Sequence, residues 1–263
     1  GGLLPQRAGR AEAATSLTPR GGLALRLQRG QVIGWSIGLM LLGVVYGTVG
    51  SDVEQLFEDN PEFEDFIELT GGASIIDSYI SYTLVLGALL TAGFAVSSVL
   101  RLRTEERAGR ADLMLGGPMS RPAWMASHLW VTLVGVVALL AASGVGTGLG
   151  LALALEDAGR IAPTVGASLA HVPAVLVVAG AAVALQGVRS AWGSTAWAVL
   201  GLSVAVGLFA ELLRLPEWVR GLSPLDHTPG MPAEPFEALP VVLLALVAVL
   251  LVGVGVVAFS RRD

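Results

Sequence analysis

The sequence predicts an all-α, polytopic membrane protein with six transmembrane helices, and three observations support this fold class. First, 54% of the 263 residues are hydrophobic and only 14% are charged, whereas soluble domains carry about 25% charged residues. Second, six apolar segments are each long enough to cross a bilayer, which takes about 20 helical residues. Third, the arginines gather in the links on one side of these segments. The expected spans are roughly 31–50, 79–100, 127–155, 165–187, 191–213 and 239–259.

The distribution of arginine sets the expected orientation. The chain has no lysine, and all 16 basic residues are arginine. Cytoplasmic loops of membrane proteins are enriched in these residues. If the N-terminal end is cytoplasmic, 13 arginines fall in inner segments and only three, Arg160, Arg214 and Arg220, fall in outer segments. We therefore expect both ends of the chain in the cytoplasm, in a multi-pass protein of the plasma membrane.

The stretch RGGLALRLQRG at residues 20–30 precedes the first span. Leu23 and Leu27 are four residues apart. Arg26 and Arg29 are three apart, so a helix here would have an apolar side and a basic side. Such a helix lies along a membrane surface. We expect an interfacial helix that turns into the first span; an ordinary basic flank is the alternative.

The predicted spans and their ends contain few ionisable or strongly polar residues. Such residues within a membrane are functional candidates by default. His171 is expected a little way into the fourth span from the outer side, and none of the candidates is expected at the middle of the membrane. This counts against an ion-coupled secondary transporter, which usually needs a buried carboxylate or a broken helix there. The candidates are Asp77, His128, His171, Gln186 and Glu211.

The chain carries no recognisable catalytic or metal-binding motif. The absence of cysteine excludes thiolate metal sites and cysteine nucleophiles, and the absence of lysine excludes a Walker A loop. His128, His171 and His227 lie in separate segments without a zinc motif. We therefore expect no metal, no cofactor and no nucleic-acid partner for this chain, and no enzymatic site on it.

A charged stretch at 101–124, RLRTEERAGRADLMLGGPMSRPAW, separates the second and third spans. Residues 104–115 can form a short helix, because Glu106 and Arg110 are an i,i+4 pair of favourable order. The Gly-Gly-Pro run that follows would end that helix. The stretch is either a solvated cytoplasmic loop or a docking helix for a cytosolic protein.

The residue pattern of this stretch resembles the loop after the second span in ABC-2 type permeases. More narrowly, it is similar to actinobacterial permeases described as exporters of polyketide antibiotics. Further similar motifs are LALRLQRG (23–30), EDNPEF (58–63), SPLDHTP (223–229) and SRRD (260–263), so the resemblance covers essentially the whole chain. The residues that carry it in the loop are Glu105-Glu106, Gly109-Arg110, Asp112, Met114-Leu115, Pro118, Ser120-Arg121 and Trp124.

The resemblance implies an ABC-2 (type V exporter-like) bundle that works with a separate ATPase subunit, on which ATP and Mg are bound. The loop at 101–124 then contains a coupling helix that contacts the ATPase, the helix at 20–30 contributes to the same contact, and 211–238 forms an outer re-entrant segment. The implied docking residues are Glu105, Glu106, Gly109, Arg110, Asp112, Leu113, Met114 and Leu115, and the implied interfacial residues are Leu23, Arg26, Leu27 and Arg29.

Members of the polyketide-exporter group typically carry two six-span halves, whereas this chain has one. It resembles the C-terminal half, because it opens with a linker at 1–19 rather than with Met. The resemblance implies a permease that exports a hydrophobic or amphiphilic compound, antibiotic-like or lipid-like, together with a second half on the same chain or in a homodimer. An ion-coupled transporter and a non-transporting membrane scaffold are the alternatives.

Overall fold

The computed structural model describes residues 22–58, 74–107, 121–210 and 213–261. Within these ranges every regular element is a helix. Six helices or helix pairs are long and apolar enough to cross a membrane, which confirms the predicted all-α, six-span fold. They are Gln28–Gly50, Ile75–Leu102, Trp124–Leu155, Ala158–Val188, Ala191–Phe209 and Ala238–Ser260.

The helices are mostly longer than the apolar segments that predict them. The first helix joins the expected interfacial segment, the first span and part of the acidic outer link in one unbroken run, because nothing in that run stops a helix. The elements in chain order are α1 (Gly22–Glu58), α3 (Ile75–Arg107), α5 (Arg121–Leu155), η3 (Ala158–Arg160), α6 (Ile161–Ala170), α7 (Val172–Val188), η4 (Ser190–Thr195), α8 (Ala196–Phe209), α9 (Glu217–Arg220), η5 (Pro224–His227) and α10 (Ala238–Ser260).

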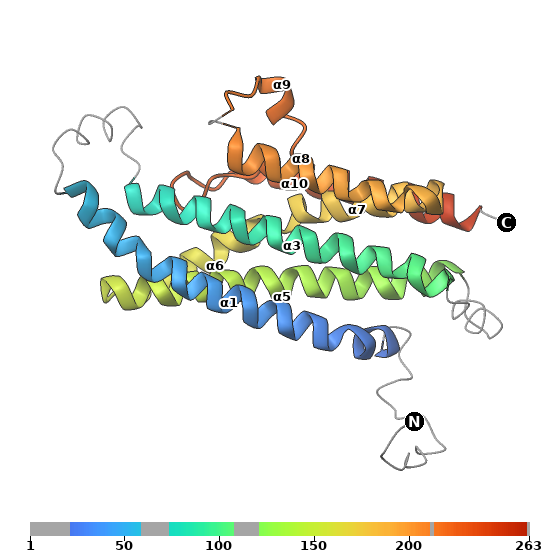
Figure 1. The fold of residues 1–263 in the computed structure, drawn as a ribbon, viewed down its shortest axis with the longest axis horizontal. Coiled ribbons are helices and arrows are strands. Elements are labelled where there is room, and N and C mark those ends of the chain that lie inside the picture. Colours follow the sequence, from blue (N-terminus) through green and yellow to red (C-terminus); the bar gives the residue numbers. More distant parts are fainter. Residues whose placement is uncertain (1–21, 59–73, 108–120, 211–212, 262–263) are drawn as a thin grey trace, which may run out of the picture.

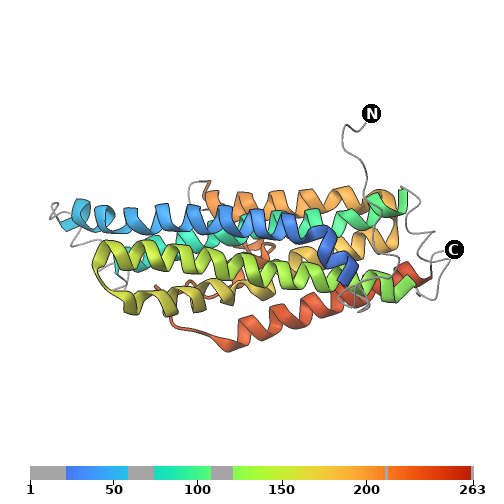
Figure 2. The same ribbon diagram turned by 90° about the horizontal axis from the view of Figure 1, so that it is seen from below.

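The long helices run side by side in an elongated bundle with α3 at its centre (Figure 1). α3 contacts α1, α5, α6, α7 and α8, and 67% of its most apolar stretch is buried. The beginning of α1 and the end of α10 lie at the same end of the bundle (Figures 1 and 2). The arginine bias assigns this end to the cytoplasm, and we call it the inner end.

Glycines set how closely α1 approaches α5. A Cβ added at Gly43 would lie 2.7 Å from the backbone nitrogen of Thr147, and one added at Gly146 would collide with the backbone of Met40. Small residues allow such close helix contact in membranes, where the hydrophobic effect does not hold helices together. By contrast, Gly34 and Gly38 have no atom within 4 Å of an added Cβ, so the close glycine contacts with α5 lie in the outer part of α1.

The fourth span is broken between α6 and α7 at His171. Pro173 lies in the first turn of α7 and lacks the N–H that would bond the carbonyl of Leu169, so the helical hydrogen bonding is interrupted here. His171 is 2% exposed and lies near the middle of the span Ala158–Val188. The predicted position of His171 close to the outer side of the membrane was wrong. The helical span begins several residues before the apolar segment from which that position was predicted.

Candidate functional site

The predicted ATPase-docking residues are only partly covered by the structure. Glu105 and Glu106 lie in the last turn of α3, so the second span continues as one helix into the charged stretch. Their role as docking residues stays a prediction. Gly109, Arg110, Asp112, Leu113, Met114 and Leu115 lie outside the described residues.

The predicted interfacial residues Leu23, Arg26 and Leu27 lie in the first turns of α1, continuous with the first span. Figure 2 shows that the dark blue beginning of α1 bends out of line with the rest of the helix. Arg29 is exposed, whereas the adjacent Gln28 is only 1% exposed. The beginning of α1 therefore has a buried polar contact that the amphipathic pattern of leucines and arginines does not predict.

Gln28 belongs to a group of four buried polar residues that joins three helices near the inner end. The Ser98 hydroxyl on α3 donates to Oε1 of Gln28 at 2.9 Å, and Oγ1 of Thr132 on α5 lies 2.8 Å from the same hydroxyl. Nε2 of Gln28 lies 3.5 Å from Nδ1 of His128 on α5. All four side chains are at most 9% exposed. We call Gln28, Ser98, His128 and Thr132 the inner cluster.

The hydrogen bonds of the inner cluster form a directed chain. Because each hydroxyl has one proton, Thr132 must be the donor in a hydrogen bond to Ser98 when Ser98 donates to Gln28. Thr132 can alternatively donate to the carbonyl of His128, 3.1 Å away in its own helix. The two arrangements differ in whether the Thr132 hydroxyl bonds to α3 or within α5.

Trp124 connects the inner cluster to the last helix. Its ring lies edge-on to His128 with centroids 5.2 Å apart and stacks on Phe259 of α10 at 6.3 Å. Trp124 is 3% exposed, whereas its position after the charged stretch suggests an exposed aromatic belt residue. The beginning of α5, directly after the loop at 101–124, is thus packed against α1, α3 and α10 together.

Sequence reasoning singled out His128 but missed Gln28, Ser98 and Thr132. The i,i+4 spacing of His128 and Thr132, which puts both on one face of a helix, was the available signal on α5. No local signal connects Gln28 or Ser98 to that face, since Ser98 is one of two adjacent serines near the end of an apolar run and Gln28 stands among the arginines that precede the first span. Only the packing of α1 and α3 against α5 brings the four together.

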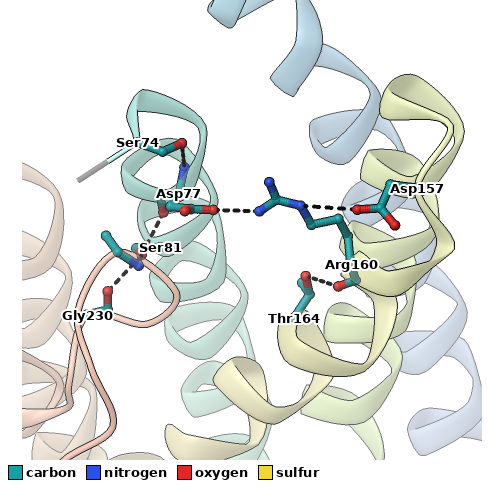
Figure 3. Close-up of polar contacts among 8 residues, drawn as sticks. Ser74, Asp77, Ser81, Asp157, Arg160, Thr164 and Gly230 are labelled. Atoms are coloured by element: carbon teal, nitrogen blue, oxygen red, sulfur yellow. Dashed lines mark hydrogen bonds and ion pairs between the residues drawn. The ribbon is translucent and has the colours of Figure 1, made fainter. Parts of the chain in front are cut away.

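At the outer end, Arg160 links α3 to the turn between α5 and α6 (Figure 3). Its guanidinium donates to Oδ1 of Asp77 at 3.0 Å and lies 3.7 Å from Oδ2 of Asp157. Oδ1 of Asp157 accepts from the backbone of Gly159 and so caps η3. Asp77 thus has an ordinary structural partner near the outer end of its helix. Glu211, another candidate, lies outside the described residues.

The link between the last two spans folds back onto the bundle. We call residues 213–237 the outer segment; it contains α9 and η5. The Ser81 hydroxyl on α3 contacts the carbonyl of Gly230 at 2.9 Å (Figure 3), and Leu225 is 3% exposed within the main hydrophobic core. Figure 1 shows α9 standing clear of the long helices, so the segment is anchored through η5 and Gly230 rather than through α9.

Among the described residues, no group of three His, Asp or Glu side chains is placed to hold a metal ion.

Residues 17–260 match the family described as the C-terminal domain of the multidrug efflux system permease Rv1217c. The chain belongs to this family. It is 34% identical, over its whole length, to the multidrug efflux system permease protein Rv1217c of Mycobacterium tuberculosis strain H37Rv. The predicted resemblance to the C-terminal half of a permease is thereby confirmed.

The chain spans about half the length of this relative, 48% of it. The six spans therefore correspond to one half of a longer permease in that protein. Together with the six membrane-crossing helices, membership of the family makes this chain part of a multi-pass membrane protein.

Proposed function

We propose that this chain is the C-terminal six-span half of the permease subunit of an ATP-driven ABC exporter in a bacterial inner membrane. The observation that carries the proposal is the match of almost the whole chain to the C-terminal domain of a multidrug efflux permease. A second six-span half, on the same polypeptide or on a second copy, completes the pathway. The substrate is a hydrophobic or amphiphilic compound, in keeping with the apolar spans.

ATP and Mg are bound and hydrolysed on a separate ATPase, which docks on the loop between α3 and α5. The inner cluster supports this route for energy transfer, because it ties the ends of the two helices that carry the loop to the beginning of α1. A displacement of the loop is transmitted to α3 and α5 directly and to α1 through Gln28. The helices then alternate between inward and outward openings, and the substrate leaves between the two halves.

The docking assignment is tested by co-purifying the complete permease with a candidate ABC ATPase from the same genome. We expect Glu106→Arg, and the double change Leu113→Asp with Met114→Asp, to abolish the complex, because they reverse a charge and remove the apolar face of the predicted helix. Glu217→Arg, the same charge reversal on the exposed outer helix α9, is the matched control and should leave the complex intact. Unchanged binding in all variants would contradict the assignment.

One observation favours an ion-coupled transporter as a second candidate. His171 lies buried at a helix break near the middle of the fourth span, and its Nδ1 is 3.1 Å from the carbonyl of Ala167. Buried ionisable residues at broken helices mark ion sites in secondary transporters. Proteoliposomes containing the permease and the ATPase separate the two candidates, since an exporter of the proposed kind needs ATP, whereas an ion-coupled transporter runs on a pH gradient alone.

A further inference from the structure

Two cavities lie against the outer segment, and Asp226 lines both. The first, of about 190 Å³, lies between α3, α8 and the outer segment. Its wall is largely apolar, and Arg220 and Asp226 are the charged residues among the described ones that line it. Tyr82, Val85, Val206, Leu208 and Leu225 form the apolar part.

The position of this cavity along α3 places it inside the bundle rather than on top of it. Tyr82 and Val85 are seven and ten residues beyond the start of α3 at Ile75, which corresponds to a depth of about 10 to 15 Å at 1.5 Å per residue. A molecule in the first cavity would therefore contact the outer half of the membrane-crossing helices.

The second cavity, of about 330 Å³, is acidic. Asp226, Glu234 and Glu237 line it, together with His227, Thr228 and three prolines. The two cavities thus present three carboxylates and one guanidinium. A cleft with an excess of one charge concentrates ions of the opposite charge, so the charges lining the two cavities favour a positively charged guest.

The carboxylate shared by both cavities is only loosely paired. Nη2 of Arg220 lies 3.7 Å from Oδ1 of Asp226, and the two side chains are 41% and 30% exposed. A pair with this separation and exposure is weak, because water solvates both groups. Another cation can therefore take the place of Arg220 on Asp226 at little cost.

A buried hydroxyl next to Asp226 lacks a partner. Thr228 lines the second cavity and is 9% exposed, and its Oγ1 has no hydrogen-bond partner among the described residues. The same holds for Oγ of Ser223, a fully buried residue at the other end of η5. Such orphaned groups are unfavourable. Together they indicate that the segment around Asp226 can accept a polar group from outside the described residues.

We propose that the two cavities form a binding site for an organic cation with an apolar body. The cationic group lies on the carboxylate of Asp226 and displaces Arg220, while the apolar body lies against α3 and α8 in the first cavity. Tyr82, which is 52% exposed, offers its ring face to the cation. The role of this ligand as export substrate rests on the proposed function; its binding does not.

The experiment compares tetraphenylphosphonium with tetraphenylborate, which share shape and size but have opposite charge. Binding to the complete permease in lipid nanodiscs is measured by equilibrium dialysis without the ATPase. We expect Asp226→Asn to weaken tetraphenylphosphonium binding by about tenfold or more, since a charge-assisted contact is lost. Arg220→Gln should instead strengthen it by roughly threefold, because a competing cation is removed. Glu217→Gln, an exposed carboxylate on α9 outside both cavities, should change nothing.

Opposite signs for the two partners of one ion pair are the decisive result, because a purely structural pair would give the same sign for both variants. Equal binding of tetraphenylborate, or an Asp226→Asn variant that binds like the wild type, would overturn the proposal. If Asp226→Asn does not fold, Tyr82→Ala at an exposed position provides the test: weaker binding supports the site, and unchanged binding overturns it. If the variants change tetraphenylphosphonium binding as expected but the permease does not bind the ATPase, the site is supported and the proposed exporter function is refuted. If the permease binds the ATPase but tetraphenylphosphonium binding does not depend on Asp226, the exporter function is supported and the site is refuted.

Discussion

The buried polar groups of the inner cluster are paired with one another across helices, whereas two buried hydroxyls beside η5 in the outer segment, those of Ser223 and Thr228, have no partner among the described residues. Ser98 contacts both Gln28 and Thr132 at hydrogen-bonding distance. In the outer segment, Arg220 and Asp226 are separated by 3.7 Å, and Thr228 has no partner among the described residues. Both regions lie beside α3: Ser98 belongs to the inner cluster, and Tyr82 and Val85 line the first cavity together with Asp226.

This difference separates two tasks. A network in which the polar groups are hydrogen-bonded to one another transmits movement between helices without a ligand. A network with unpaired polar groups can gain hydrogen bonds when a ligand binds. The two ends of α3 can therefore be altered independently. Changes at the inner end should affect the coupling between the ATPase and the helices without affecting cation binding. Changes at the outer end should affect cation binding first. Three predictions test this contrast, beginning with the largest expected effect.

Leu225→Ala should loosen the outer segment. The side chain is 3% exposed in the main core, and removing a buried leucine costs about 2 to 5 kcal/mol. We expect the low end of this range, because the cavity beside Leu225 allows the segment to relax. Thermal unfolding in nanodiscs measures the loss. Leu222→Ala, at a position that is 57% exposed, should be nearly neutral; equal effects of the two changes would show that η5 is not the anchor.

Ser98→Val should weaken the inner cluster. It leaves Gln28 without its donor and Thr132 without its cross-helix partner, at a cost of about 1 to 3 kcal/mol in the free energy of unfolding. Export should fall while tetraphenylphosphonium binding and ATPase docking remain. Ser97→Val is the matched control, because the Ser97 hydroxyl donates to the carbonyl of Gly93 in its own helix. Normal export by the Ser98→Val variant would contradict the proposal that the inner cluster transmits movement from the loop to α1.

Asp77→Asn should have the smallest effect. The Asp77–Arg160 pair joins α3 to the turn after α5, but Arg160 is 38% exposed, and such pairs contribute less than about 1 kcal/mol. A double-mutant cycle with Arg160→Gln measures the coupling energy, which should shrink further in 1 M salt. A coupling energy above about 2 kcal/mol, or one that does not change with salt, would mean that polar contacts hold the outer end together as strongly as the inner end.

Hydropathy and arginine bias predict the number of spans, because a bilayer imposes length and composition on each helix separately. They do not predict which polar residues meet. Gln28 and Ser98 are 70 residues apart, and neither stands out in its own segment. The burial of Trp124 is not predictable from its own segment for the same reason, since Phe259 contacts it only when α10 packs beside α5.

The misplacement of His171 has a local cause. The expected span started at 165, where the sequence becomes continuously apolar, whereas the helical span starts at Ala158. Pro173 marks the break in the sequence, but a proline within a span does not reveal the depth at which it lies. Depth depends on how neighbouring helices align; the Ser168 hydroxyl, for example, donates to the carbonyl of Leu140 near the middle of α5.

The close fit of α1 on α5 also bears on how the protein is made. α1 has its most extensive contact with α5, the third of these six spans, and not with α3, the second. While only the first two of these spans have entered the bilayer, α1 lacks the helix whose Thr147 and Gly146 lie against its Gly43 and Met40. The contact between α1 and α5 therefore forms only after the charged stretch and α5 have been synthesised.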